Sequence, residues 1–176
     1  TRRDGDAIEI VVADDGPGSL RAAINTVNAD TTGTAFTITF DADYTITLAT
    51  PLPNLSRTSG PVTALGDRGT GTPPTVLDGT ALGAGYSGLR VTGDGWRIQG
   101  FVVMKVTAGF GVTLRGNYNT LRHNYIGLSA DGSTARPNGT GVLLTDGAHH
   151  NLVTGNWIGG NLGHGGWLFS TYVTAT

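Results

Sequence analysis

The chain has 176 residues, which is enough for one domain that buries roughly 70% of the surface of its unfolded chain. Its net charge of −2 and its pI near 6 provide no positive field for a phosphate backbone, so we expect no nucleic-acid binding. The absence of cysteine excludes disulfides and thiolate zinc sites, and no apolar run approaches the roughly 20 residues of a membrane span.

The first expected elements are a strand and a helix. Residues 8–12 (IEIVV) form a β-rich run that should open the structure. The segment DDGPGSLRAAINTVNAD predicts a helix at about residues 18–29, with Ser19 as its N-cap. One face of this helix is apolar at helical spacing: Leu20, Ala23, Ile24 and Val27. We expect this face to cap the exposed end of the first coil of a repetitive β structure.

Two period-2 strands follow the helix. Residues 36–40 (FTITF) and 44–48 (YTITL) each place alternate apolar side chains on one face. Proline and glycine interrupt the next connection, and residues 66–74 (GDRGTGTPP) predict a long loop before a strand at 75–77. These segments are expected to build the first coils.

Residues 88–160 contain one strand-turn-strand pattern three times, as GLRVTGDGWRIQGFVV, GVTLRGNYNTLRHNYIG and GVLLTDGAHHNLVTGNWIGG. The first two copies are roughly 23 residues apart, and insertions lengthen the second step. A period in the low twenties, with glycine and asparagine at the corners, predicts an all-β fold, a right-handed parallel β-helix (solenoid). The copies align in four apolar columns: Leu89, Val112 and Val142; Val91, Leu114 and Leu144; Ile98, Leu121 and Val153; Val103, Ile126 and Ile158.

Four segments resemble a known family: DDGPGSLRAAINTVNAD, FTITFDADYTITLATPLPNL, TPPTVLDGT and NYIGLSADGSTARPNGTGVLL. They are similar to the N-terminal part of secreted bacterial right-handed parallel β-helix repeat proteins, which carry a SLREAI-like capping segment. The resemblance spans residues 14–161 and implies that fold and a secreted or cell-surface location. Family members serve as surface proteins or carbohydrate-active modules. No catalytic motif comes with the matching segments.

The domain is expected to have four parts: an N-terminal strand and capping helix (1–35), first coils and loops (36–87), three aligned coils (88–161), and an incomplete coil or tail (162–176). In the last part HGGWLF resembles the opening of a fourth copy, with Gly166 near the position of Gly141, but STYVTAT shows no turn and no second strand. The pattern therefore predicts an open apolar end, covered by the tail, by another chain or by more of a longer protein.

The residues expected to cap this end or to assemble there are apolar or aromatic: Trp167, Phe169, Tyr172 and Val173.

An outward column of aromatic residues suggests a glycan-binding strip. Val102, Tyr125 and Trp157 align, and all three side chains should point outward. Successive coils should place Trp157 about 4.8 Å from Tyr125 along the axis of the solenoid. Such a shelf can stack on a sugar ring, and Arg122 and His123 lie nearby. The alternative is that the two rings stack on each other and stabilise the sheet.

Catalytic and metal-binding residues are not assigned. His149 and His150 follow Asp146 and could hold a metal or supply a base, but exposed turn histidines without such a role are the simpler interpretation. The acids are scattered and Lys105 is the only lysine. A hydrolase would need loops to bring Asp131 and Asp146 together at roughly 5 to 10 Å.

Two kinds of corner residue have structural interpretations. Asn119 aligns with Asn151 and Asn124 with Asn156, which predicts hydrogen-bonded ladders along the axis. The insertion at 129–138 contains Asp-Gly-Ser, but one acid without an acidic partner is a weak calcium signal, so we expect a solvated loop.

Three functional hypotheses remain open from the sequence. The first is a non-catalytic structural or adhesive module of a secreted or cell-surface protein. The second is a carbohydrate-binding or carbohydrate-active (lyase, hydrolase or epimerase-type) module acting on polysaccharide. The third is self-association through the open C-terminal end. The expected partners are polysaccharide or other copies of the chain, with no cofactor, no metal, no nucleic acid and no membrane insertion.

Overall fold

The computed structural model describes residues 2–4, 7–13, 17–67, 73, 75–168 and 173–175. Within these residues the chain forms one α-helix and seventeen strands in three sheets. The first pair, β1 (Arg2–Asp4) and β2 (Ala7–Val12), is antiparallel, and all other pairs of named strands are parallel. The described chain is therefore mostly β with one short helix, as predicted.

Helix α1 (Pro17–Ala29) begins earlier than expected. Pro17 occupies the first helical position, where its fixed φ suits the helix and its missing N–H group would have no partner. Ser19 therefore lies inside the first turn, and its prediction as the N-cap was wrong. The predicted apolar face is confirmed as buried: Leu20, Ala23, Ile24 and Val27.

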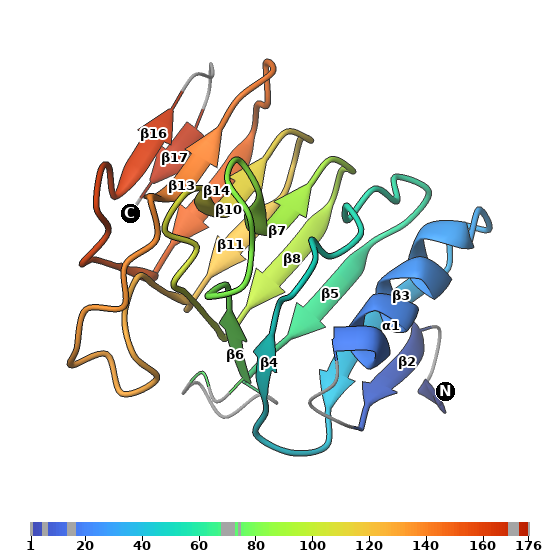
Figure 1. Ribbon diagram of the computed structural model, residues 1–176. Helices are drawn as coiled ribbons and strands as arrows, with labels where there is room; N and C mark the ends of the chain where they lie inside the picture. Colours follow the sequence, from blue (N-terminus) through green and yellow to red (C-terminus); the bar gives the residue numbers. More distant parts are fainter. Residues whose placement is uncertain are drawn as a thin grey trace.

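The strands form three sheets, A, B and C (Figure 1). Sheet A contains, in spatial order, β1, β2, β3 (Ala35–Phe40), β5 (Val62–Leu65), β8 (Trp96–Gln99), β11 (Thr120–Arg122), β14 (Asn151–Thr154) and β17 (Val173–Ala175). Sheet B contains β15 (Trp157–Ile158), β12 (Tyr125–Ile126), β9 (Phe101–Met104), β6 (Thr75–Asp78) and β4 (Thr45–Thr47). Sheet C contains β16 (Gly166–Leu168), β13 (Thr140–Leu144), β10 (Phe110–Leu114) and β7 (Ser87–Val91).

From β7 onward the chain visits sheets C, A and B in the same order. We call each such set of three strands a coil: β7–β9 is coil 1, β10–β12 is coil 2 and β13–β15 is coil 3. Coil 4 begins with β16 and β17. Figure 1 shows α1 at one end of the stack and β16 and β17 at the other.

The register confirms all four predicted columns. Val112, for example, pairs with Leu89 on one side and Val142 on the other. Every member of the columns is buried except Ile158, which is partly exposed in the last complete coil. Each coil therefore buries its apolar side chains between its neighbours.

Both predicted asparagine ladders are present. Asn119 Oδ1 accepts the N–H of Trp96 at 2.8 Å, and Asn151 Oδ1 accepts the N–H of Asn119 at 2.8 Å. Asn124 and Asn156 repeat this arrangement at the next corner, at 3.0 Å. The side chains thus satisfy backbone donors that the corners remove from the sheets.

A third ladder was not predicted. Asn138 Oδ1 accepts the N–H of Val106 at 3.0 Å, and Asn161 Oδ1 accepts the N–H of Asn138 at 3.2 Å. Asn138 ends the insertion of coil 2, so its equivalence to Asn161 is hidden by the unequal spacing of the copies.

Arg57 connects the turn after α1 to later segments through hydrogen bonds. Its side chain is 1% exposed, pairs with Asp30 at 2.9 Å and lies 4.8 Å from the ring centroid of Phe36. It also donates to the carbonyl groups of Thr34 and Gly60. This arrangement fixes the helical end of the stack.

Candidate functional site

The C-terminal end differs from the sequence-based expectation. Gly166 pairs with Val142 and so lies one position from the partner of Gly141, near it as expected. Strand β17 pairs in parallel with β14, so the expectation that the tail has no second strand was wrong. Without β17 the edge of β14 would present unpaired N–H and C=O groups, so a strand can form against it without a strong apolar pattern of its own.

Among the described residues, coil 4 exposes an apolar surface. Leu168 continues the column of Leu114 and Leu144, which are 0% exposed, yet Leu168 is 51% exposed. Within the described part of the chain, β15, β16 and β17 each have a partner on one side only. We call this surface the open end, and its exposed apolar side chains are Trp157 (55%), Leu162 (68%), Trp167 (42%) and Leu168.

The four residues expected at this end are described to different extents. Trp167 lies on β16 in register with Leu143, and its ring contacts that of His164 at 5.0 Å between centroids. Val173 starts β17 and pairs with Asn151 through its backbone. Phe169 and Tyr172 lie outside the described residues.

The predicted glycan strip is only partly assembled. Tyr125 and Trp157 are in register, and their rings stack on each other with centroids 5.0 Å apart and planes 15° apart. A Cβ atom added at Gly132 would lie 2.8 Å from Trp157 Cε3, so the insertion packs against the rings. Val102 shares the column but is fully buried, so its expected exposure was wrong.

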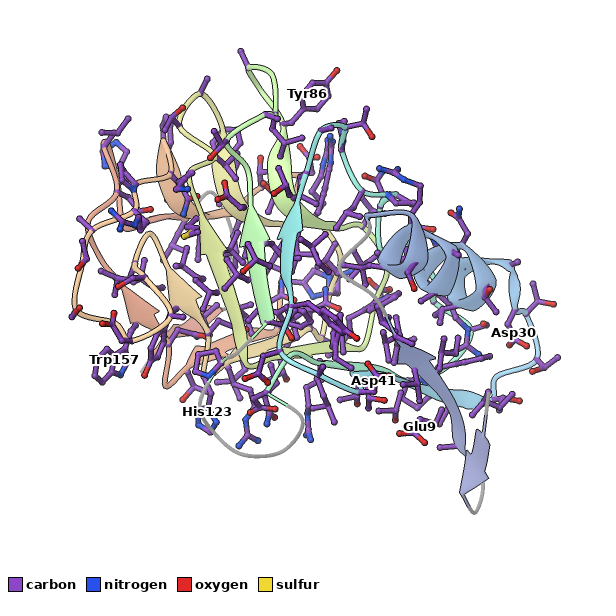
Figure 2. The ribbon with its side chains drawn as sticks, turned by 60° about the horizontal axis from the view of Figure 1, so that its bottom comes forward. Glu9, Asp30, Asp41, Tyr86, His123 and Trp157 are labelled. Carbon is purple, nitrogen blue, oxygen red and sulfur yellow. The ribbon has the colours of Figure 1, made fainter. Side chains whose placement is uncertain are left out.

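His123 joins the two aromatic residues around a hollow of about 350 Å³, which Gly155 also lines. Figure 2 shows His123 and Trp157 on the same side of the molecule. A Cβ atom at Gly155 would lie 2.7 Å from His123 Cδ2, so a larger residue there would displace this ring. The alignment could have identified Gly155, because it follows Thr154, the register partner of Arg122.

Arg122 does not line this hollow. It lies on the outer face of sheet A between Gln99 and Thr154, and its Nε atom is buried without a hydrogen-bond acceptor. The predicted strip therefore separates into a hollow formed by His123, Tyr125 and Trp157 and an arginine on the neighbouring sheet.

The acids discussed for catalysis are held in local interactions. Hydrogen bonds from Ser129 and Ser133 lower the pKa of Asp131 to about 2. Asp146 forms an ion pair with Arg115. A carboxylate that is held ionised is a poor proton donor at neutral pH, so Asp131 lacks the properties of a general acid.

The single lysine is also paired. Lys105 Nζ lies 2.7 Å from Asp78 Oδ2. Burial raises the pKa of Asp78, but hydrogen bonds from Lys105 and Thr80 outweigh this effect and hold the pKa below its ordinary value. The pair fixes the end of β6 against the end of β9.

The histidine turn contains an interacting cluster. Nδ1 of His149 lies 2.8 Å from Nδ1 of His150, and the ring of Tyr118 stacks on His150 with centroids 5.0 Å apart. Among the described residues, no group of three or more histidine and acidic side chains is placed to hold a metal ion.

The described residues also contain no helix that is both long and apolar enough to cross a bilayer. Comparisons with known proteins add no assignment: no protein-family model matches the chain, and a search of the curated proteins found no match. The functional inference therefore rests on the geometry of the open end and of the surface hollows.

Proposed function

We propose that the chain is a right-handed parallel β-helix that serves as a non-catalytic structural or adhesive module of a secreted or cell-surface protein. We further propose that its open end docks a second copy. The parallel sheets, visited in the same order by successive coils, support the fold. The observation that carries the function is the difference between the ends, since α1 covers one end while Leu168 is 51% exposed at the other.

The geometry favours contact between two open ends. Helix α1 covers the core at the helical end, and four of the large apolar side chains that are exposed among the described residues gather at the open end: Trp157, Leu162, Trp167 and Leu168. Two open ends present the same strand edges and apolar side chains, so they can form an isologous contact with two-fold symmetry. Fully burying a leucine-sized side chain contributes about 1.5–3 kcal/mol, which offsets part of the cost of association.

Sedimentation velocity at several protein concentrations tests this proposal. We expect the unmodified chain to form a dimer at high concentration and Leu168→Arg to remain monomeric, because a charge would have to be buried in the contact. Val11→Arg is the matched control, since Val11 is 39% exposed on β2, away from the open end. A monomer at all concentrations, or dimerisation of Leu168→Arg like that of the unmodified chain, would contradict the proposal.

Carbohydrate binding is a second candidate, favoured by the hollow that His123, Tyr125 and Trp157 share. Stacked aromatic rings beside a polar side chain are suited to the apolar face and hydroxyl groups of a sugar. On a glycan array, Trp157→Ala should lose the signal of the unmodified chain, while Tyr118→Ala should keep it. Equal binding by both variants would argue against the hollow.

A further inference from the structure

A second hollow, of about 220 Å³, lies on the outer face of sheet C. Two arginines line it, Arg90 from β7 and Arg115 from the turn after β10, together with the hydroxyl residues Ser87, Thr113 and Thr145. Figure 2 shows Tyr86, the neighbour of Ser87, on the side of the molecule away from His123 and Trp157. The hollow is therefore separate from the candidate carbohydrate site.

Arg90 is the unusual residue of this hollow. It lies between the buried residues Leu89 and Val91 and is itself half-buried. Its Nε atom is buried and has no hydrogen-bond acceptor. Arg122 Nε also lacks an acceptor, so what distinguishes Arg90 is that it lines the hollow, where a ligand can approach its ionised guanidinium group.

The other groups suit an anion at this position. Asp146 pairs with Arg115, so the two arginines and this carboxylate carry one net positive charge. Ser87 Oγ lies 2.8 Å from Thr113 Oγ1, and one of these hydroxyls keeps its hydrogen for a ligand. The planar guanidinium fork of Arg90 matches the oxygens of a carboxylate or a sulfate.

The residues that line the hollow indicate which kind of molecule bears the anionic group. Phe110 and Leu143 also line the hollow and supply apolar surface beside the charged and hydroxyl groups. The hollow is smaller than the roughly 300 Å³ at which pockets for drug-sized molecules begin. It therefore suits one charged sugar unit of a longer chain, whose hydroxyls and apolar ring face meet the hydroxyl residues and Phe110.

We propose that this hollow binds the carboxylate or sulfate group of an acidic polysaccharide, with Arg90 as the anion-binding residue. The site is independent of the proposed self-association, because it lies on the outer face of sheet C and uses none of the exposed apolar residues of the open end.

Isothermal titration of the whole chain tests the site with three polymers: polygalacturonate, dextran sulfate and neutral dextran. We expect binding of at least one acidic polymer, weakened at least tenfold in Arg90→Met and unchanged in Arg97→Met. Arg97 is an exposed arginine on sheet A, so its variant controls for the loss of one positive charge. Thr145→Val should weaken binding less than Arg90→Met.

The three polymers identify the anion. Binding of polygalacturonate alone assigns a carboxylate, and binding of dextran sulfate alone assigns a sulfate. The proposal is overturned if Arg90→Met binds like the unmodified chain, if neutral dextran binds equally well, if no polymer binds, or if free sulfate binds as tightly as the polymers.

Two further measurements separate this proposal from the others. The melting temperature of Arg90→Met should equal or exceed that of the unmodified chain, because the variant removes a buried donor without an acceptor. Leu168→Arg should bind the acidic polymer normally, and Arg90→Met should sediment like the unmodified chain. A variant that loses both polymer binding and self-association would be misfolded. If Arg90→Met does so, binding of the acidic polymer by Thr145→Val tests the site instead, and normal binding by that variant would contradict the proposal.

Discussion

Individual asparagines connect the coils through their side chains. Asn124 is 1% exposed, and its Oδ1 accepts the N–H of Phe101 at 2.9 Å while its Nδ2 donates to the carbonyl group of Ile98 at 3.1 Å. Leucine has a similar size but can neither accept nor donate. Its introduction would leave buried backbone groups of coil 1 without partners.

Asn124→Leu should therefore lower the free energy of unfolding by about 3 kcal/mol, measured by urea denaturation. Asn54→Leu is the control, because Asn54 is exposed and the change should stay within about 0.5 kcal/mol. A small effect for both variants would mean that water replaces the ladder, and the ladders would then contribute little to stability.

The Arg57 contacts should determine the stability of α1 on the stack. Arg57→Met keeps much of the volume but removes the donor to the carbonyl groups of Thr34 and Gly60, while the carboxylate of Asp30 keeps its hydrogen bonds from Thr32. A buried carbonyl group left without a donor costs about 1–3 kcal/mol. We expect a loss in this range, because Arg57 is buried while the carboxylate of Asp30 reaches solvent.

Chemical denaturation measures this loss, and Arg21→Met provides a matched control. Arg21 also joins α1 to a later segment, through Pro51 and Thr50, but its contacts are partly or fully exposed. An exposed contact of this kind contributes about 0–1 kcal/mol. Similar losses in the two variants would show that burial of Arg57 is not the deciding factor.

The elements differ in how far the sequence could predict them. The sequence predicts β3 because every second side chain of this strand is buried, which gives alternating apolar and polar residues. It also predicts the four apolar columns, because pairing between successive coils places equivalent residues in register. Strand β17 was missed because its pairing depends on the edge of β14 rather than on an apolar pattern of its own.

The surface sites were less accessible to sequence reasoning. The column of Tyr125 and Trp157 was predictable, but the mutual stacking of the rings and their contact with Gly132 depend on the path of an irregular insertion. The sequence alone does not identify Arg90 as a binding residue, because a single arginine in a strand forms no recognisable motif. Its significance comes from the walls of the hollow and from the missing acceptor at Nε.

Within the described residues, coils 2 and 3 pair strand by strand only with the coil before and the coil after them, so the coils form a stack. Stability in such a stack is set by the coils and by the interfaces between them, so an end with one interface opens more easily than the middle. The helical end is covered by α1, whereas the strands of coil 4 have partners on one side only within the described part of the chain. The protection of backbone amides against hydrogen exchange should therefore decrease from coil 2 to coil 4.

Hydrogen exchange followed by mass spectrometry tests this gradient. At low protein concentration we expect the slowest exchange in β8 and β11, which have partners on both sides, and the fastest in β16 and β17. If open ends dock, raising the concentration should slow exchange in coil 4 while coil 1 stays unchanged, because only coil 4 gains an interface. Leu168→Arg should abolish the concentration dependence, and uniform exchange over all coils would contradict the stack.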